Sequence, residues 1–455
     1  MRHLRPLLLR APWLLLLLVA CAPAGEPGAD GAGAARSAER PRFVPPTVTL
    51  VPAAEVRVTS PVGSDCNRPS WWVGDTFYQM VSNQHPWRSR PGRDAATAQP
   101  FEPARFADDA PTFRWDSTRN WYVHDINAAD RPTSTQMRWM ESVWRHPRTG
   151  VLHGLYHLEE GPYVRCPAPY ERPYLSVPHV GLARSTDGGM TWTDRGLVIS
   201  DGTFPIDCAS PSRFFTGGVG DPSMAVDAEG RWAYVAFTSY SGSDPRTQGI
   251  QLARIAVADL DAPIAPDGTS RARRWWNGAW SGPGLQGTPS PRLAQRWPAG
   301  PIGRATPILA PERSWQQPDG GGYWGPSLSW NAHVGAYLLL LNKVSGARAF
   351  DAEGNYLAWI PDMARPAAAP ARPIRLNDLP HGPTPAWYVQ ALGDPAMRGT
   401  SMLTGQDARL FLGEHSRVLL RFGVAGAPAP DAAAPRTGER PAPAPATGSR
   451  VVRLR

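Results

Sequence analysis

The stretch Gly220–Phe237 (GDPSMAVDAEGRWAYVAF) holds the pattern that decides the fold. It begins with a Gly/Pro step, reaches a serine at Ser223, turns at Asp227–Gly230 and continues as an alternating apolar run. This layout predicts two antiparallel strands joined by a tight turn. Four other segments share it, and they lead into expected second strands at Thr76–Ser82, Val151–His157, Ala336–Leu341 and Ala408–Leu412.

The spacing of the five copies indicates a larger repeating unit than a hairpin. Aligned on their serines, the copies are separated by 72, 81, 104 and 74 residues at Ser70, Ser142, Ser223, Ser327 and Ser401. Each step has room for about four strands and their loops, which is the content of a propeller blade. A β-sandwich is the alternative, but it predicts strands every ~8–12 residues without the longer period. We predict an all-β protein that forms a single five-bladed β-propeller, with an insertion at Asp261–Trp297 in the long third step.

Composition agrees with this prediction and excludes one class of partner. The chain has 51 Pro, 44 Gly and 19 Trp, which disfavour helices and suit loops and pleated surfaces. Its 42% hydrophobic residues are enough for a sizeable core. The formal net charge is +8, yet Lys343 is the single lysine and the arginines are scattered rather than clustered. Nucleic-acid binding is therefore not expected.

The N-terminus carries an export signal. Arginines at positions 2, 5 and 10 precede the apolar run Trp13–Ala20, which is too short for a dependable membrane span. The sequence LVAC at 18–21 resembles the lipobox of bacterial lipoproteins, and this resemblance implies cleavage before Cys21 and its acylation, including palmitate. An ordinary cleaved signal peptide is the alternative. The expected location is the bacterial cell envelope, facing the periplasm or the cell surface, with membrane contact through the lipid anchor only.

The full chain divides into four segments by composition. We expect a signal peptide at 1–20, a flexible tether at 21–43, the propeller at 44–423 and a disordered Pro/Ala-rich tail at 424–455. Cys66, Cys166 and Cys208 remain after export, and Cys166 with Cys208 is the preferred disulfide. No zinc-type spacing occurs, so no metal site and no cofactor are predicted, although a structural Ca²⁺ or Na⁺ in the channel is compatible with oxygen-rich walls. The protein is expected to be a monomer.

A second motif points to the same fold. Ser185–Trp192 (STDGGMTW) resembles the Asp-box of sialidase-like propellers. Its physics is that of a hairpin turn, in which Asp187 accepts hydrogen bonds, glycine supplies positive φ and Trp192 packs beneath. The motif therefore predicts structure rather than chemistry, and a true sialidase is disfavoured because no arginine cluster for a substrate carboxylate precedes it.

Acidic residues precede three of the aligned serines. In a propeller the first strand of each blade is innermost, so Asp65, Glu141 and Asp221 are expected to converge on the axis. Blades four and five have Gly325-Pro326 and Thr400 at these places. Converging carboxylates suit general acid/base hydrolysis of a glycosidic bond, because proximity separates their pKa values. The alternative is that each acid caps a turn or pairs with a neighbouring arginine.

Three short motifs resemble the five-bladed propeller glycoside hydrolases of the arabinanase/xylosidase and invertase-like groups. They are Asp65 through Trp72, Gly220–Ser223 and Trp324–Asn331, within a likeness that covers about 65–422. The resemblance implies that Asp65 is base or nucleophile and that Asp221 tunes the acid. Those families place their acid glutamate after the Asp-Pro aspartate, whereas Glu141 precedes it, and Glu141 is chosen by its register alone.

The remaining candidates concern binding. Aromatic and polar side chains near the inner strands could contact a saccharide, namely Asn67, Trp71, Trp72, His85, His157 and Trp324. Packing between blades and hydrogen bonding to buried backbone are the structural alternatives. We predict a cell-surface glycoside hydrolase whose partner is an oligo- or polysaccharide. The competing hypothesis is a propeller lipoprotein that binds a glycan or a protein without turnover.

Overall fold

The computed structural model describes residues 43–58, 66–74, 76–82, 96–101, 112–113, 137–160, 175–189, 192–290, 293, 298–394, 397–413 and 415–423. By residue contacts the chain divides into Met1–Phe43 and Val44–Arg455, and the sheets belong to the second unit. Asp65, His85 and Cys166 lie outside the described residues, as do Cys21 and the predicted signal, most of the tether and the tail. Predictions that fall on them stay predictions.

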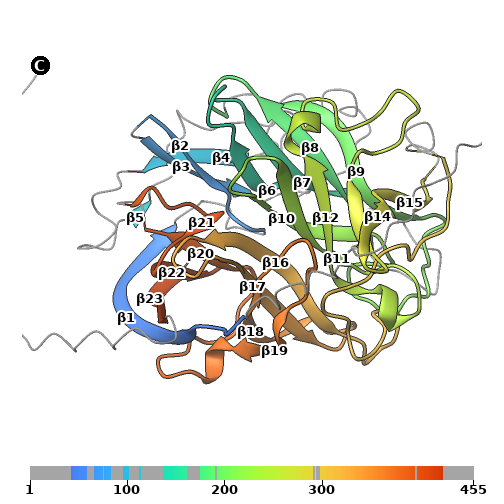
Figure 1. The fold of residues 1–455 in the computed structure, drawn as a ribbon. Coiled ribbons are helices and arrows are strands. Elements are labelled where there is room, and N and C mark those ends of the chain that lie inside the picture. The colour runs from blue at the N-terminus through green and yellow to red at the C-terminus, as the bar shows by residue number, and fades with distance from the viewer. Residues whose placement is uncertain are drawn as a thin grey trace, which may run out of the picture. The chain divides into compact units, whose positions relative to one another are not determined.

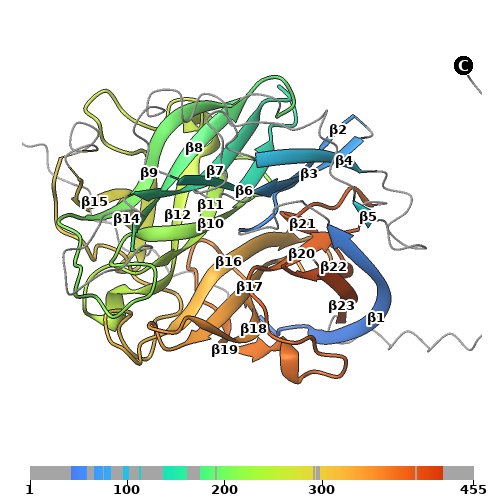
Figure 2. The same ribbon diagram turned by 180° about the vertical axis from the view of Figure 1, so that it is seen from behind.

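Five sheets form the described unit (Figures 1 and 2). Blade one contains β2 (Ser70–Val73), β3 (Thr76–Ser82) and β4 (Ala96–Phe101). Blade two contains β6 (Met137–Arg145), β7 (Leu152–Glu160), β8 (Val177–Ser185), β9 (Thr193–Thr203) and β15 (Leu285–Thr288). Blade three contains β10 (Val219–Val226), β11 (Trp232–Ser239), β12 (Gly249–Ala256), β13 (Arg273–Trp276) and β14 (Ala279–Pro283).

The other two blades bring the chain ends together. Blade four contains β16 (Gly322–Asn331), β17 (Ala336–Ser345), β18 (Asp351–Ile360) and β19 (Ala369–Arg375), with β21 (Leu403–Thr404) beside β16. Blade five contains β20 (Val389–Gly393), β22 (Asp407–Leu412), β23 (His415–Gly423), β1 (Thr47–Val58) and β5 (Thr112–Phe113). The N-terminal strand β1 pairs with the C-terminal strand β23 from Thr47↔Gly423 to Arg57↔His415. Blade five is therefore closed by both ends of the described unit.

The first strands of the blades are neighbours in turn. β6 contacts β2 and β10, while β16 contacts β10 and β20. In both views β6, β10 and β16 lie next to one another at the centre of the sheets (Figures 1 and 2). This arrangement is the predicted five-bladed β-propeller, which is confirmed. Helical residues in the described part form single 3₁₀ turns at Pro245–Thr247, Val257–Asp259 and Leu376–Asp378, with one further 3₁₀ residue at Met397. None of these helices has the length and hydrophobicity that crossing a membrane requires.

Packing between blades explains why some strands are apolar throughout instead of alternating. The run Leu338–Leu341 in β17 is completely buried on both faces of the strand. Leu339 and Leu341 belong to a cluster shared with blade three, so one face of blade four is covered by its neighbour. A strand inside a propeller blade is thus buried on two sides, as in a parallel sheet between helix layers.

The aligned serines link the inner strands of successive blades. Ser142 Oγ accepts the backbone N–H of Met224 at 3.0 Å, and Ser223 Oγ accepts that of Leu328 at 2.8 Å. Met224 and Leu328 directly follow the aligned serines of the next blades. The repeated serine therefore has a structural cause: it satisfies a buried backbone donor at each of these blade junctions.

The same device joins the last blade to the first. The backbone N–H of Ser401 donates to Ser70 Oγ at 2.7 Å, and the N–H of Ser70 donates to Ser401 Oγ at 3.1 Å. The prediction that Ser401 opens the first strand of blade five is wrong, because Ser401 lies in the turn before β21 and the first strand is β20. Five residues (VQALG) are too short for their alternation to be read from sequence.

The insertion in the long third step contributes strands to two blades. Residues from Asp261 to Trp297 supply the outer strands β13 and β14 of blade three. They then supply β15, which pairs in parallel with β9 of blade two. The insertion therefore extends two blades, and it fastens blade three to blade two.

The turn between β8 and β9 is held by side chains of the STDGGMTW segment. Ser185 Oγ donates to Asp187 at 2.7 Å and accepts the N–H of Gly189 at 2.9 Å. Trp192 is completely buried, and its indole N–H donates to the carbonyl of Gly189 at 3.0 Å. Gly188 and Gly189 have φ of 80° and 101°, which accounts for glycine at both positions.

The cysteines divide into a thiol and a half-cystine among the described residues. Cys208 is disulfide-bonded, and its partner lies outside the described residues. Cys66 is a buried thiol whose Sγ lies 3.0 Å from the carbonyl oxygen of Asn67. The pairing of Cys208 with Cys166 remains a prediction.

Candidate active site

The inner strands of three blades carry a bulge directly before the aligned serine. The pairing register shifts between Met140 and Ser142, between Gly220 and Ser223, and between Trp324 and Ser327. The residues released from the ladder are Glu141 in blade two, Asp221-Pro222 in blade three and Gly325-Pro326 in blade four. A bulge redirects a side chain without ending the strand, which makes it a suitable place for a functional group.

The bulges of blades three and four have the same unusual backbone. Asp221 has φ of 52° and Gly325 has φ of 53°. This left-handed conformation is free for glycine, whereas an L-residue pays a cost that aspartate reduces but does not abolish. Strained positions of this kind gather at functional sites, so the side chain of Asp221 is a functional candidate on backbone evidence alone.

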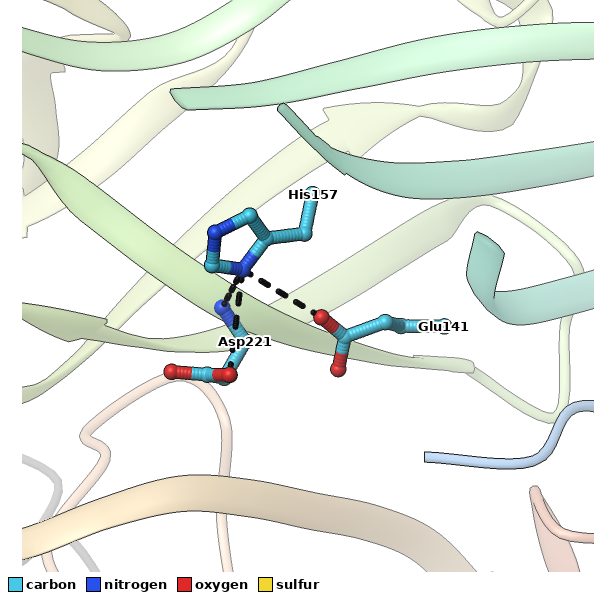
Figure 3. Close-up of side chains that lie close together, drawn as sticks. All are labelled: Glu141, His157 and Asp221. Carbon is cyan, nitrogen blue, oxygen red and sulfur yellow. Dashed lines mark hydrogen bonds and ion pairs between the residues drawn. The ribbon is translucent and has the colours of Figure 1, made fainter. Parts of the chain in front are cut away.

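Glu141, His157 and Asp221 meet in one buried cluster (Figure 3). His157 Nδ1 lies 3.4 Å from Glu141 Oε1, 3.7 Å from Asp221 Oδ1 and 3.0 Å from the backbone nitrogen of Asp221. The imidazole comes from β7, between Glu141 on β6 and Asp221 on β10. Two of the three acids predicted to converge, Glu141 and Asp221, are thus brought together, with a histidine between them.

Burial governs the protonation of Glu141. Removal from water raises the pKa of Glu141 to about 8, a rise to which the charge of Asp221 adds and which His157 partly offsets. Burial also raises the pKa of Asp221, against the opposing effect of His157. At neutral pH Glu141 is therefore a protonated carboxylic acid, which is the state that a general acid needs.

His157 responds in the opposite sense to burial and to its neighbours. Burial opposes charging the ring, but contacts with Glu141 and Glu159 outweigh it and raise the pKa of His157 well above its usual value. Glu159 Oε1 lies 3.6 Å from His157 Nε2. A neutral ring accepts the N–H of Asp221 at Nδ1, and a protonated ring turns the same nitrogen into a donor toward the carboxylates. The neighbouring acids favour the protonated form.

The structural role of His157 is shown by its equivalents in other blades. Thr238 Oγ1 accepts the N–H of Gly325 at 3.0 Å, as His157 Nδ1 accepts the N–H of Asp221. Asn342 Oδ1 accepts the N–H of Val389 in the next junction at 3.1 Å. All three acceptors are on second strands. Each is the cross-strand partner of the residue that lies three positions before the aligned serine of its blade. The backbone N–H at this position needs only a hydrogen-bond acceptor. Blade two supplies a histidine, which accepts the bond and can also take up a proton.

Two further side chains complete the surroundings of the acids. Tyr240 donates its hydroxyl to Asp221 Oδ2 at 2.9 Å, and burial together with Asp221 raises the pKa of this tyrosine well above its usual value. Sequence reasoning missed Tyr240, which follows β11 without a motif. Asn67 donates to Glu141 Oε2 at 3.4 Å and to the carbonyl of Pro326 at 3.1 Å. Asn67, a predicted binding residue, thus joins blades one, two and four at the axis.

The other predicted binding residues are distributed differently. Trp71 and Trp324 are each 2% exposed. Trp71 stacks on Tyr78, and Trp324 packs edge-on against Phe350. Trp72 is partly exposed and lies at the other end of the inner strands. His85 lies outside the described residues.

The cluster offers three atoms to a metal ion. One ligand atom each from Glu141, His157 and Asp221 lies within 4.8 Å of the others. Ca²⁺ prefers six to eight oxygen ligands, whereas this set holds two carboxylates and an imidazole whose Nδ1 already accepts a backbone N–H. The described residues therefore fit Ca²⁺ poorly, and no chemical step is assigned to a metal.

Comparison with known proteins finds likeness in structure only. No protein-family model and no curated protein matches the chain. An exo-β-1,3-galactanase from Phanerochaete chrysosporium, solved with β-1,3-galactotriose, is 11% identical with a TM-score of 0.41, over 83% of this chain and 67% of that one. The catalytic domain of a Coprinopsis cinerea α-L-arabinofuranosidase is 9% identical with a TM-score of 0.39, over 83% and 97%.

An endo-arabinanase from Bacillus licheniformis is 12% identical with a TM-score of 0.37, over 81% of this chain and 96% of that one. The galactanase is longer than the part it shares, since this chain spans about two thirds of it. Identities of this size say nothing about which reaction this chain catalyses, so its chemistry has to be argued from its own residues.

Proposed function

We propose that this protein is a glycoside hydrolase that cleaves an oligo- or polysaccharide at the axis of the propeller. The observation that carries the proposal is the pairing of a buried Glu141, whose pKa is raised to about 8, with Asp221 on a left-handed bulge. A carboxylic acid that stays protonated at neutral pH, beside a second carboxyl group, is the arrangement that glycosidic bond cleavage requires.

In this proposal Glu141 is the general acid. Its proton passes to the glycosidic oxygen as the bond from that oxygen to the anomeric carbon breaks, and Glu141 is left as a carboxylate. His157 Nδ1 lies 3.4 Å from Glu141 Oε1. A protonated ring, in which Nδ1 gives up the N–H of Asp221 and donates toward this oxygen, stabilises the new negative charge. Glu159 and, to a smaller extent, Asp221 favour the charged form of His157, and the charge of Asp221 adds to the raised pKa of Glu141 before the reaction.

The short separation of the two carboxyl groups supports the tuning role of Asp221. Ligand oxygens of Glu141 and Asp221 lie within 4.8 Å of one another. This is shorter than the ~6.5–9.5 Å that an inverting acid/base pair needs for its water, and shorter than the ~5–5.5 Å of a retaining acid/nucleophile pair. Asp221 is therefore placed beside the acid, and the base or nucleophile is assigned to Asp65. Asn67, two residues later in the chain, contacts Glu141 and supports that assignment.

We propose the cell envelope as the site of action, with the chain held by a lipid on Cys21 and acting as a monomer. The features that support it are the arginines followed by an apolar run and the LVAC sequence at 18–21. A substrate outside the cytoplasm would then be a glycan of the envelope or the surroundings.

The second candidate is a non-catalytic propeller that binds a glycan or a protein. The burial of the acids favours it, because the side chains of Glu141 and Asp221 are 1% and 3% exposed. In that case the cluster would stabilise the centre of the propeller, and binding would occur without turnover.

One experiment separates the two candidates. The purified protein is assayed against a panel of aryl glycosides and glycans, followed by the variants Glu141→Gln, Asp221→Asn and Asp65→Asn. The hydrolase predicts turnover that falls by two or more orders of magnitude in Glu141→Gln and Asp65→Asn, because an amide neither donates the proton nor activates water. Asp221→Asn should lower the rate chiefly through a displaced pH profile.

Asp194→Asn is the matched control. Asp194 accepts the hydroxyl of Tyr156 at 2.8 Å, as Asp221 accepts that of Tyr240 at 2.9 Å, but it lies in the β9 strand outside the cluster. Its activity should equal that of the wild type. Glycan affinity without turnover across the panel, unchanged in Glu141→Gln, would support the binding protein instead.

A further inference from the structure

The inner strands end in a pocket, at the opposite end from the acids. It has a volume of about 500 Å³, and each of the five repeats contributes to its lining. The contributing side chains include Trp72, Trp144, Val226, Trp330 and Leu403. Glu141 precedes Trp144 by three residues on the same strand, so about 10 Å of strand separates the acid from this pocket, at ~3.3 Å per residue. We refer to it as the tryptophan pocket.

Met402 separates the tryptophan pocket from the active site. Ser142 Oγ lies 3.7 Å from Met402 Sδ, although blade two and the segment after β20 are not neighbours around the ring. Met402 also packs against the apolar cluster shared by blades two and three. Its side chain therefore crosses the axis at the level of the aligned serines, and a ligand in the tryptophan pocket would not reach Glu141.

The lining is aromatic and apolar, yet part of it faces water. Trp72, Trp144 and Trp330 are all partly exposed. Leu403 is 39% exposed, and Met397, next to the lining residue Arg398, is 79% exposed. Exposed apolar side chains that gather around one hollow mark a binding site more often than scattered ones do. A pocket of this volume accommodates a group of about disaccharide size.

The charges at the rim favour an anionic group. Arg398 lies over the ring of Trp72 at 4.7 Å and donates to the carbonyl of Gly74, and Arg145 also lines the pocket. Asp227 is the carboxylate among the lining residues, and its Oδ1 accepts the backbone N–H of Arg231 at 2.6 Å in the β10–β11 turn. The lining residues therefore carry two guanidinium groups and one carboxylate, and the carboxylate is already engaged.

We propose that the tryptophan pocket binds a saccharide that carries a carboxylate, such as a uronic acid unit. The C–H faces of a pyranose stack on indole rings, and a carboxylate accepts the forked donors of a guanidinium. A purely apolar ligand gains nothing from the positive charge of the two guanidinium groups, and a small anion covers little of the exposed indole surface. A carboxylated sugar satisfies both, and its binding is independent of the proposed hydrolytic function.

Calorimetric titration of the full chain tests this proposal with three probes: a galacturonic acid disaccharide, the neutral galactose disaccharide and benzoate. The acidic disaccharide should bind at least tenfold more tightly than either other probe. Arg145→Gln should weaken its binding about tenfold and leave neutral-sugar binding unchanged. Trp144→Ala should weaken binding of both sugars, also about tenfold, since ~1.4 kcal/mol corresponds to that factor.

Control variants outside the tryptophan pocket test whether the ligand binds there or at the active site. Trp276→Ala removes a partly exposed tryptophan on β13, whose ring lies under the guanidinium of Arg304. Arg417→Gln removes an exposed arginine of blade five. Both should bind like the wild type. Asp221→Asn should also bind normally, whereas loss in Asp221→Asn with retention in Arg145→Gln would place the ligand at the active site and overturn the proposal. Absence of binding, equal affinity for the neutral disaccharide, or binding of benzoate alone would overturn it as well.

Discussion

Asp221 and Gly325 occupy the same bulge on successive blades, with φ of 52° and 53°. Each precedes a proline and then the aligned serine, and each donates its N–H to a side chain on the second strand of the preceding blade. Blade four fills this left-handed position with the residue that adopts it most readily. Blade three fills it with an aspartate. The strained backbone directs this carboxylate to the hydroxyl of Tyr240 and the ring of His157.

Replacing Asp221 by glycine and by alanine separates strain from chemistry. Both variants lose the carboxylate, and both should lose activity if Asp221 tunes the acid. Asp221→Gly should be more stable than Asp221→Ala by about 1–2 kcal/mol, because alanine carries a Cβ into the left-handed region. Denaturant unfolding of the two variants measures the difference. An alanine variant equal to or more stable than the glycine variant would show that the bulge is not strained.

The free energy of unfolding should fall as the pH rises from about 4.5 to about 8. Glu141 has an ordinary pKa of 4.5 when unfolded and about 8 when folded, so its contribution is complete below the lower value and lost through the higher one. The raised pKa values of Asp221 and His157 act in the same direction. Denaturant unfolding from pH 4 to 9 should show this slope in the wild type and in Asp194→Asn, and a smaller slope in Glu141→Gln. Equal slopes would contradict the raised pKa of Glu141.

Exchange of His157 for asparagine tests its two roles separately. Asn342 performs the structural role in another junction, so His157→Asn should keep the fold and a melting temperature near that of the wild type. The pKa of Glu141 should rise further, because His157 lowers it in the wild type. The alkaline limb of the pH–rate profile should therefore move to higher pH. An unmoved limb would leave His157 with its structural role alone.

The serine contacts between blades should be measurable as stability. Ser142→Ala leaves the buried N–H of Met224 without its acceptor, which costs about 1–3 kcal/mol. Ser345→Ala, at an exposed position of β17, should change the free energy of unfolding by less than about 0.5 kcal/mol. Urea unfolding of both variants makes the comparison, and equal effects would refute the role assigned to the repeated serine.

The proposed lipid anchor on Cys21 predicts a change of location in a variant that lacks the thiol. Cys21→Ser should move the protein from the membrane fraction to the soluble fraction, because acylation needs the thiol of the residue. Membrane fractionation with immunodetection reads the result. Continued membrane association of Cys21→Ser would disprove the anchor.

The sequence predicted the number of blades and most of their inner strands, but it did not predict β20 or the added strand β15. The period of the aligned serines was sufficient for the architecture, because each inner strand repeats the same junction chemistry at Ser142 and Ser223. It failed where a strand is short or comes from an insertion. β20 has five residues, and β15 joins blade two only through a parallel pairing with β9 that no local pattern encodes.

The candidate site was predicted only in part, because the repeat locates residues near the aligned serines but not the contacts that the fold adds. Glu141 and Asp221 were found because their register to the aligned serines can be read from the sequence. Tyr240 was not, because its contact with Asp221 depends on how the chain leaves β11 rather than on a motif. His157 was singled out only as a polar residue near the axis. That it bridges two acids follows from a cross-strand pairing with Trp139, which a sequence does not display.

The pairing of β1 with β23 has a consequence for biosynthesis. Thr47 and Gly423 are partners in one ladder, so β1 meets this neighbour only after the more than 350 residues that separate it from β23 have been synthesised. Contacts between such distant residues form slowly, and an incomplete chain exposes an unpaired edge on β1. Closure of the ring is therefore the final event in the folding of the described unit, because one edge of β1 stays without its ladder partner until β23 is available.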